Sequence, residues 1–255
     1  MKAYIAFCKK ELLEQVRTYR LIIMAAVFAL FGILSPFTAK ILPELLNGTD
    51  MGGGLIVTLP EATALDSWAQ FFKNIGQMGM LTLIIVFCGI IANELTRGTL
   101  TSILAKGVKR HTVIFAKFTV ACAVWTLSYL LSFAIDYAYT VYFWGNDPVE
   151  HALLTFASPW VYGLFLLSLL ILGGVLFKTL YGSLLSTGGV VLILSLLSIK
   201  PEFQKYNPIS LASGTLGLLD GQKSPHDFTG ALIICATLIV VCLAASVLTF
   251  DKKEL

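Results

Sequence analysis

Charged residues are scarce in this sequence of 255 residues: Asp, Glu, Lys and Arg together make up only 13% of it. Soluble domains contain about 25% charged residues, and the mean hydropathy here is +0.83. The composition therefore excludes an ordinary soluble domain and places the chain among membrane proteins. The net charge of +3 is too small to favour nucleic acid as a partner.

Side chains for catalysis or metal binding are also few. The three histidines, His111, His151 and His226, fall in different connections, and no His-Glu-x-x-His motif is present. The five cysteines form no Cys-x-x-Cys pair, which argues against a zinc site and a disulfide framework. No serine lies in a Gly-x-Ser-x-Gly motif. We therefore expect no catalytic residue, metal or cofactor on this chain.

A phosphate-binding loop is missing as well. The nearest stretch, from Gly217 to Ser224, has the wrong glycine spacing and an intervening glutamine before Lys223. A Gly-x-x-x-x-Gly-Lys-[Ser/Thr] loop needs successive backbone amides that wrap around the phosphates. If ATP is involved, another chain must bind it.

What the sequence does contain is long apolar segments. About 20 apolar residues are needed to cross about 30 Å of hydrocarbon. Six segments satisfy this requirement: Leu21–Ala39, Ile75–Leu95, Val113–Ile135, Trp160–Phe177, Tyr181–Ile199 and Thr229–Phe250. Only residues 178–180 separate the fourth from the fifth, so these form a tight hairpin or one is re-entrant. The predicted fold is an all-α integral membrane protein with six transmembrane helices in one domain, residues 1–255.

The orientation follows from the Lys and Arg residues, which gather in cytoplasmic loops. With a cytoplasmic N-terminus, five of the 18 basic residues lie outside: Lys40, Lys73, Lys200, Lys205 and Lys223. The other thirteen lie inside, Lys117 among them. We therefore expect a multi-pass protein with both termini cytoplasmic, in a cell membrane, most simply the bacterial cytoplasmic membrane.

Residues 1–20 predict an amphipathic helix in the membrane interface. Ile5, Leu12 and Val16 recur at helical spacing on one side, while Lys9 and Lys10 lie on the other. Such a helix either anchors the chain on the lipid surface or contributes to docking of a partner.

The outer connections carry weaker signals. Residues 64–72 predict a surface helix that places Trp68, Phe71 and Phe72 at the headgroup level. Residues 200–228 are expected to form an ordered cap over the helices, although long loops are often functional. Charged residues are nearly absent from the spans, and Asp136, which directly follows the third span, falls near the outer interface. It is a candidate pathway residue, because intramembrane carboxylates are usually functional.

The cytoplasmic loop, residues 96–112, has the most distinctive pattern. Gly98 follows the second span, Thr99 can cap a short helix, and Gly107 can end it. A short helix cannot bury its own apolar side, so it must lie on the membrane or in a groove of a partner. Glu94 and Arg97, at positions i and i+3, are expected to reach water and to brace the junction as an ion pair.

This pattern resembles the membrane permeases of the type-2 (exporter) family of ATP-binding-cassette (ABC) transporters. In that family a Glu at the end of the second span precedes a Gly-Thr-Leu-like element and a coupling helix. Glu94, Arg97, Gly98, Thr99 and Leu100 match this element, and a basic turn at Lys109 and Arg110 follows it. The resemblance implies these candidate coupling residues: Glu94, Arg97, Gly98, Thr99, Leu100, Ile103, Leu104 and Lys106. The interfacial helix, the six spans and the chain length agree with the resemblance.

The resemblance implies a permease subunit of an ATP-driven exporter. ATP and Mg²⁺ would bind to a separate ABC ATPase, which would dock on the helix near residues 99–106, helped by the interfacial helix. A second permease, identical or related, would complete the pathway. The alternatives are an ATP-independent secondary transporter or channel that depends on Asp136, and a membrane immunity or scaffold protein without transport. The substrate stays open.

Overall fold

The computed structural model describes residues 2–46, 60–105, 107–145 and 151–252, with the side chains at 2, 3, 46 and 101–103 left out. All regular structure in this part of the chain is helical. The elements are α1 (Lys2–Arg17), α2 (Arg20–Leu46), α3 (Ala64–Asn74), η1 (Ile75–Gly79), α4 (Met80–Phe87), α5 (Ala92–Thr96), α6 (Thr99–Ala105), α7 (Arg110–Trp144), α8 (Ala152–Phe177), α9 (Leu180–Leu197), α10 (Pro201–Gln204), α11 (Ser210–Ser213), α12 (Thr215–Leu219) and α13 (His226–Lys252).

Six helical segments of the described chain are long and apolar enough to cross a membrane, which confirms the expected all-α membrane fold. They are Arg20–Leu45, Ala64–Thr96, Arg110–Trp144, Ala152–Phe177, Leu180–Leu197 and His226–Lys252. Most extend beyond the apolar windows read from the sequence, because polar and aromatic residues continue each helix past the hydrocarbon. α9 is the shortest, with 18 residues.

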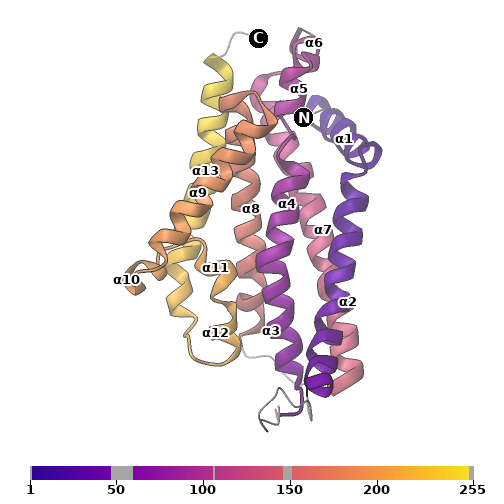
Figure 1. Ribbon diagram of the computed structural model, residues 1–255. Helices are drawn as coiled ribbons and strands as arrows, with labels where there is room; N and C mark the ends of the chain where they lie inside the picture. Colours follow the sequence, from indigo (N-terminus) through magenta and orange to yellow (C-terminus); the bar gives the residue numbers. More distant parts are fainter. Residues whose placement is uncertain (1, 47–59, 106, 146–150, 253–255) are drawn as a thin grey trace.

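The second of these segments begins much earlier in the chain than its apolar window. The surface helix expected at residues 64–72 is α3, and α3 continues through the π-helical turn η1 into α4 (Figure 1). Trp68, Phe71 and Phe72 are buried in the protein core. The expectation that they lie at the lipid headgroups is therefore wrong. Their large apolar area is removed from solvent by packing against α7 and α8 instead.

α7 lies at the centre of the packing. It contacts α1, α2, α3, α8 and α13, while α8 also contacts α9 and α13. The helices approach closely where a glycine faces a large ring. A Cβ atom added at Gly163 of α8 would lie 2.4 Å from the ring of Trp125 of α7, so only glycine leaves room for the indole.

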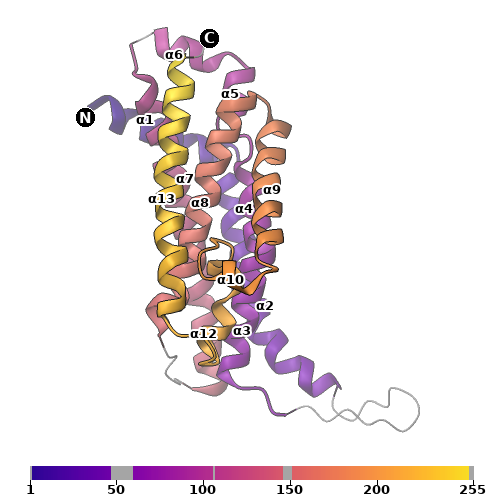
Figure 2. The same ribbon diagram turned by 90° about the vertical axis from the view of Figure 1, so that its left-hand side faces the viewer.

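The two ends of the bundle differ. At one end α1 lies across the bundle, next to α5 and α6, and α13 finishes there as well (Figure 1). This is the end at which the Lys and Arg residues gather, and we call it the α6 end. At the other end, called the α12 end, α11 and α12 lie against α3, α8 and α13 (Figure 2). The short α9 does not reach that end, so the α10–α12 segment covers it.

Candidate functional site

The loop expected to form a short helix does so. Gly98, with a φ of 68°, lies between α5 and α6 in the left-handed conformation that glycine adopts without strain. Across this turn the hydroxyl of Thr99 donates a hydrogen bond to the carbonyl oxygen of Glu94, 3.3 Å away. Gly107, with a φ of 83°, follows α6. The two glycines therefore mark the ends of α6 as a separate unit.

Thr96 links this loop by a hydrogen bond to the hairpin formed by α8 and α9. Its hydroxyl donates to the carbonyl oxygen of Lys178, 2.9 Å away. Lys178 lies between the two helices with a φ of 56°, and the hydroxyl of Thr179 accepts a hydrogen bond from the N–H of Gly182 to cap α9. The loop is thus held from the side of α8 as well as from α7.

Glu94 of α5, just before the loop, forms ion pairs with two lysines. Its Oε1 atom lies 2.6 Å from Nζ of Lys10 in α1, and its Oε2 atom lies 3.0 Å from Nζ of Lys117 in α7. The side chain points away from water and the residue is 8% exposed. The expectations that Glu94 reaches water and pairs with Arg97 are therefore wrong: Arg97 is exposed and Glu94 pairs with two lysines.

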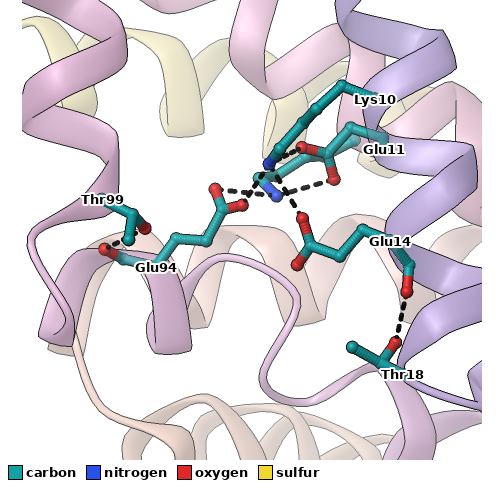
Figure 3. Close-up of polar contacts among 7 residues, drawn as sticks. Lys10, Glu11, Glu14, Thr18, Glu94 and Thr99 are labelled. Atoms are coloured by element: carbon teal, nitrogen blue, oxygen red, sulfur yellow. Dashed lines mark hydrogen bonds and ion pairs between the residues drawn. The ribbon is translucent and has the colours of Figure 1, made fainter.

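Two more carboxylates complete the arrangement, and both come from α1. Glu11 Oε2 lies 2.8 Å from Nζ of Lys117, and Glu11 Oε1 lies 2.9 Å from Nζ of Lys10. Glu14 Oε2 lies 2.8 Å from Nζ of Lys10. Figure 3 shows the labelled side chains of Lys10, Glu11, Glu14 and Glu94 pointing toward one another. We call these four residues and Lys117 the ion-pair cluster.

Burial decides how much the ion-pair cluster matters. Glu11 and Lys117 are each 1% exposed. Removal of one partner of a buried ion pair costs about 3–5 kcal/mol, because the other charge then stays buried without compensation. The cluster therefore couples the positions of α1, α5 and α7 much more firmly than a surface ion pair would.

The charges of the two partly exposed members stabilise each other. Burial opposes the charge of Lys10, but its hydrogen bonds to Glu14, Glu94 and Glu11 raise the pKa of Lys10 above its ordinary value. Burial also opposes the charge of Glu14, but the hydrogen bond from Lys10 and the nearby charge of Lys117 lower the pKa of the Glu14 carboxyl. Both residues are therefore charged at neutral pH.

The carboxylates of Glu11, Glu14 and Glu94 lie within 4.8 Å of one another, a spacing that a metal ion could bridge. Here, however, two ammonium groups lie among the three carboxylates at 2.6–3.0 Å. Only one negative charge is left over. The geometry is that of an ion-pair network, and it carries no argument for a metal site.

α1 presents a polar side to the bundle and an apolar side outward. Phe7, Glu11 and Gln15, four residues apart, are buried against the other helices. Ile5, Leu12 and Val16 are exposed, as expected for residues that face lipid or a partner. A helix is present at the expected residues, and its location in the membrane interface stays a prediction. The side that faces the protein carries the buried carboxylate of Glu11, while Lys9 and Arg17 are exposed.

Sequence reasoning missed four of the five cluster residues. Lys117 was counted as an inside residue, although it falls within the predicted span Val113–Ile135. A lysine at that place is a buried charge that requires an acidic partner. The acidic residues that can supply this partner are Glu11 and Glu14, because their spacing puts both on one side of α1.

The remaining candidate coupling residues divide by exposure. Arg97, Gly98 and Thr99 are exposed at the α6 end. Leu100 is 1% exposed and packs in the core of this chain, so the expectation that it contacts a partner is wrong. Leu104 is half-buried against the same core. The side chain of Ile103, and Lys106 as a whole, lie outside the described residues.

Arg110 holds the other side of the loop to the last helix. Its Nη1 atom donates to the carbonyl oxygen of Phe250 and to that of Asp251, the latter at 3.3 Å. Its guanidinium carbon also lies 5.5 Å from the centre of the Phe250 ring. A cation is favoured at the C-terminal end of a helix such as α13. The start of α7 and the end of α13 are thereby joined.

Asp136 lies far from this cluster, in the half of α7 near the α12 end. It is fully buried, and its Oδ2 atom accepts a hydrogen bond from Thr140, 3.4 Å away. Thr140 in turn shares a hydrogen bond of 2.7 Å with Ser67 of α3. The side chain therefore belongs to a polar contact between two helices, and a role in a pathway stays a prediction.

Comparison with known proteins agrees with this architecture. The chain is 22% identical over 260 residues to YxlG of Bacillus subtilis (strain 168), described as an uncharacterized transmembrane protein, with 100% of this chain and 99% of the relative covered. The sequence profile described as "ABC-2 family transporter protein" matches residues 5–255. The match covers the interfacial helix, the loop with α5 and α6, and all six apolar segments. The chain therefore belongs to the ABC-2 family, as a membrane transporter permease component rather than a catalytic subunit.

Proposed function

We propose that this chain is the permease subunit of an ATP-driven exporter in a bacterial cell membrane. A separate ABC ATPase would bind ATP and Mg²⁺ and dock at the α6 end, and a second permease, identical or related, would complete the complex. Family membership supports an ABC ATPase as a partner in general. The bacterial relative supports the proposed location.

The surface proposed to contact the ATPase combines α6 with the exposed side of α1. Arg97 and Lys109 flank α6 and are exposed, so they can pair with acidic groups of a soluble partner. The exposed part of the half-buried Leu104 side chain contributes apolar area to this surface. Ile5, Leu12 and Val16 extend it along α1 or rest on lipid headgroups.

The observation that carries the proposal is the position of Glu94 in the ion-pair cluster. Glu94 lies five residues before the first residue of α6, and its two oxygens pair with α1 and α7. α7 has 35 residues, which corresponds to about 52 Å of helix. A displacement of α6 by the ATPase would therefore move α1 and the full length of α7 together, so that ATP-driven closure reaches the far side of the membrane.

The experiment is co-purification with the soluble ABC ATPase encoded by a neighbouring gene. Arg97→Glu reverses an exposed charge at the proposed contact and should remove the ATPase from the purified complex while the chain still inserts. The matched control is Lys200→Glu, the same reversal at an exposed lysine of the α12 end. ATPase retained by Arg97→Glu at the wild-type ratio, or lost equally from the Lys200→Glu control, would contradict the docking surface.

A further inference from the structure

Two cavities meet at Lys73 of α3, in the half of the bundle near the α12 end. One has a volume of about 380 Å³ and lies among α3, η1, α4, α8, α9, α11 and α12. The other, about 320 Å³, lies between α2 and α3. Lys73 and Leu216 line both of them. We call the pair the Lys73 groove, and its larger part has the size of typical small-molecule pockets.

The two parts of the Lys73 groove differ in chemistry. The larger cavity is walled mainly by apolar side chains, among them Met80, Leu81, Ile84, Leu166 and Val191. The smaller cavity includes polar groups, namely Thr38, Asp66 and Gln70. The carboxylate of Asp66 is already engaged, because it accepts hydrogen bonds of 2.8 Å from the N–H and the hydroxyl of Thr63. The groove is thus apolar at one end and polar at the other, with a cation where the two parts meet.

Lys73 has no acidic partner among the residues that the structure describes. Other lysines do have partners: Lys10 and Lys117 belong to the ion-pair cluster, and Lys205 pairs with Asp227 at 3.3 Å. Lys40, close by on α2, lies 4.2 Å from the centre of the Phe143 ring. Lys73 as a residue is exposed, and no described carboxylate pairs with it, so its charge can pair with an added anion.

The depth of Lys73 suits the head of a lipid-like molecule. The stretch from Lys73 to Thr96, helical except for the turn at residues 88–91, corresponds to about 35 Å at the helical rise per residue, comparable with the hydrocarbon thickness of about 30 Å. With Thr96 at the cytoplasmic surface, Lys73 is near the outer interface, and the apolar cavity extends from it toward the middle of the membrane.

The π-helical turn η1 lines the larger cavity with Gly76 and Gln77. It begins two residues after Lys73, and such turns inside α-helices are frequent at functional sites. A Cβ atom at Gly76 would lie 3.1 Å from the carbonyl oxygen of Ala212 in α11, so the backbone of η1 passes close to α11 there. Gln77 within the irregular turn and Met80 directly after it both line the cavity.

We propose that the Lys73 groove binds a single-chain anionic lipid. Its phosphate group lies at the ammonium group of Lys73, and its chain follows the apolar cavity along α4 toward Ile84 and Val191. The charge of Lys73 selects an anion, since a charge-assisted hydrogen bond is stronger than one to a neutral head. The apolar cavity selects a molecule with a hydrocarbon chain. This site belongs to the chain alone and does not depend on the proposed ATPase.

The test uses the full chain, purified without any ATPase in an uncharged maltoside detergent. Native mass spectrometry counts the adducts of three probes: dodecyl phosphate, zwitterionic dodecylphosphocholine and inorganic phosphate. We expect one saturable adduct of dodecyl phosphate per chain. Dodecylphosphocholine should bind at least about tenfold more weakly, and inorganic phosphate should not bind in the same range, because it lacks the chain.

Three variants separate the parts of the site. Lys73→Met keeps the side-chain stem and should weaken dodecyl phosphate binding by about tenfold to a hundredfold, the loss expected for one charge-assisted contact. Lys40→Met, a control at a lysine already occupied by an aromatic ring, should leave it unchanged. Leu81→Trp fills the cavity from its exposed edge and should weaken both chain-bearing probes.

Several results would overturn the proposal. Equal affinity of dodecyl phosphate for the wild type and Lys73→Met, or equal affinity for the phosphate and phosphocholine heads, would remove the anion selectivity. Saturable binding of inorganic phosphate as tight as that of dodecyl phosphate would show a plain anion site that uses no chain. A failure of the ATPase to co-purify would not bear on these measurements, so this inference and the proposed function fail separately.

Discussion

Glu11 of α1 and Lys117 of α7, 106 residues apart in the sequence, form an ion pair of 2.8 Å that is almost fully buried. The pair places the N-terminal helix and the third apolar helix in fixed register at the α6 end. Lys10 and Glu94 extend this contact to α5. The loop that carries α6 is therefore attached to the bundle through charges, whereas most of the other helices contact one another through apolar side chains.

Lys117→Met should destabilise the protein by about 3–5 kcal/mol, because Glu11 and Glu94 would keep buried charges without a partner. The double variant Lys117→Met with Glu11→Met should recover part of that loss, since an apolar pair of similar volume needs no compensation. Thermal unfolding in detergent measures both. Lys205→Met, which breaks an exposed pair with Asp227, is the control and should cost much less than Lys117→Met. A double variant as unstable as the sum of its singles would argue against the pairing.

Glu94→Gln should leave docking of the ATPase intact and impair the coupling of ATP hydrolysis to transport. The side chain keeps its shape and α6 keeps its exposed residues, so the ATPase should still co-purify. The loss of charge weakens the pairing with Lys10 and Lys117, so transport per ATP hydrolysed in proteoliposomes should fall. Glu61→Gln, an exposed residue at the α12 end, is the matched control. Normal transport by Glu94→Gln would show that the cluster serves stability alone.

The attachment of α1 should depend on pH at both extremes. The lowered pKa of Glu14 contributes stability that is present above the ordinary value of 4.5 and is lost as the pH falls through the folded-state pKa. The raised pKa of Lys10 contributes stability that is fully present below 10.5 and is lost only as the pH rises through its folded-state value. The protection factors of the α1 amides, which correct for the intrinsic pH dependence of hydrogen exchange, should therefore be high and constant between these limits and should fall in acid.

The variant Glu14→Gln checks the cause of that acid response. It removes the carboxyl whose protonation is expected to loosen α1. The protection factors of α1 should therefore be lower at neutral pH and should change less on acidification. An acid response identical to that of the wild type would assign the effect to other carboxylates.

Gly163→Ala should destabilise the contact of α7 with α8 by about 1–3 kcal/mol, the usual cost of overpacking. The new methyl group would meet the ring of Trp125, whose Nε1 atom donates to the carbonyl oxygen of Trp160 at 3.1 Å. Thermal unfolding and tryptophan fluorescence report on both. Gly188→Ala in α9, where a Cβ atom meets nothing within 4 Å, is the control and should be neutral or slightly stabilising. Equal effects of the two substitutions would contradict the close packing.

The sequence predicts the helical architecture well because lipid imposes a simple rule on it. A span must be apolar over about 20 residues, so the six windows stand out. The rule fails where a span continues into protein contacts. Trp68, Phe71 and Phe72 are as apolar as lipid-facing residues, and only the fold shows that they are covered by α7 and α8.

The sequence predicts where the short helix of the loop lies, but it does not predict the ion pairs that Glu94 forms. Gly98 and Gly107 set the ends of α6 through backbone conformation, which is a local property of the sequence. The partners of Glu94 come from residues 10 and 117, which are brought together only by tertiary packing. Leu100 has the same apolar character as a partner-facing residue, yet it packs inward. Periodicity alone does not tell a core from an interface.

The placement of α6 between two glycines in the left-handed conformation has a practical consequence for protein engineering. Glycine at each joint lets the chain change direction without strain, whatever side chains lie between. We expect that residues 99–105 can be exchanged as a cassette between permeases of this family, provided that Leu100 is kept for the core. Under the proposed function, such chimaeras would change which ATPase a permease recruits while the six apolar helices keep their sequence.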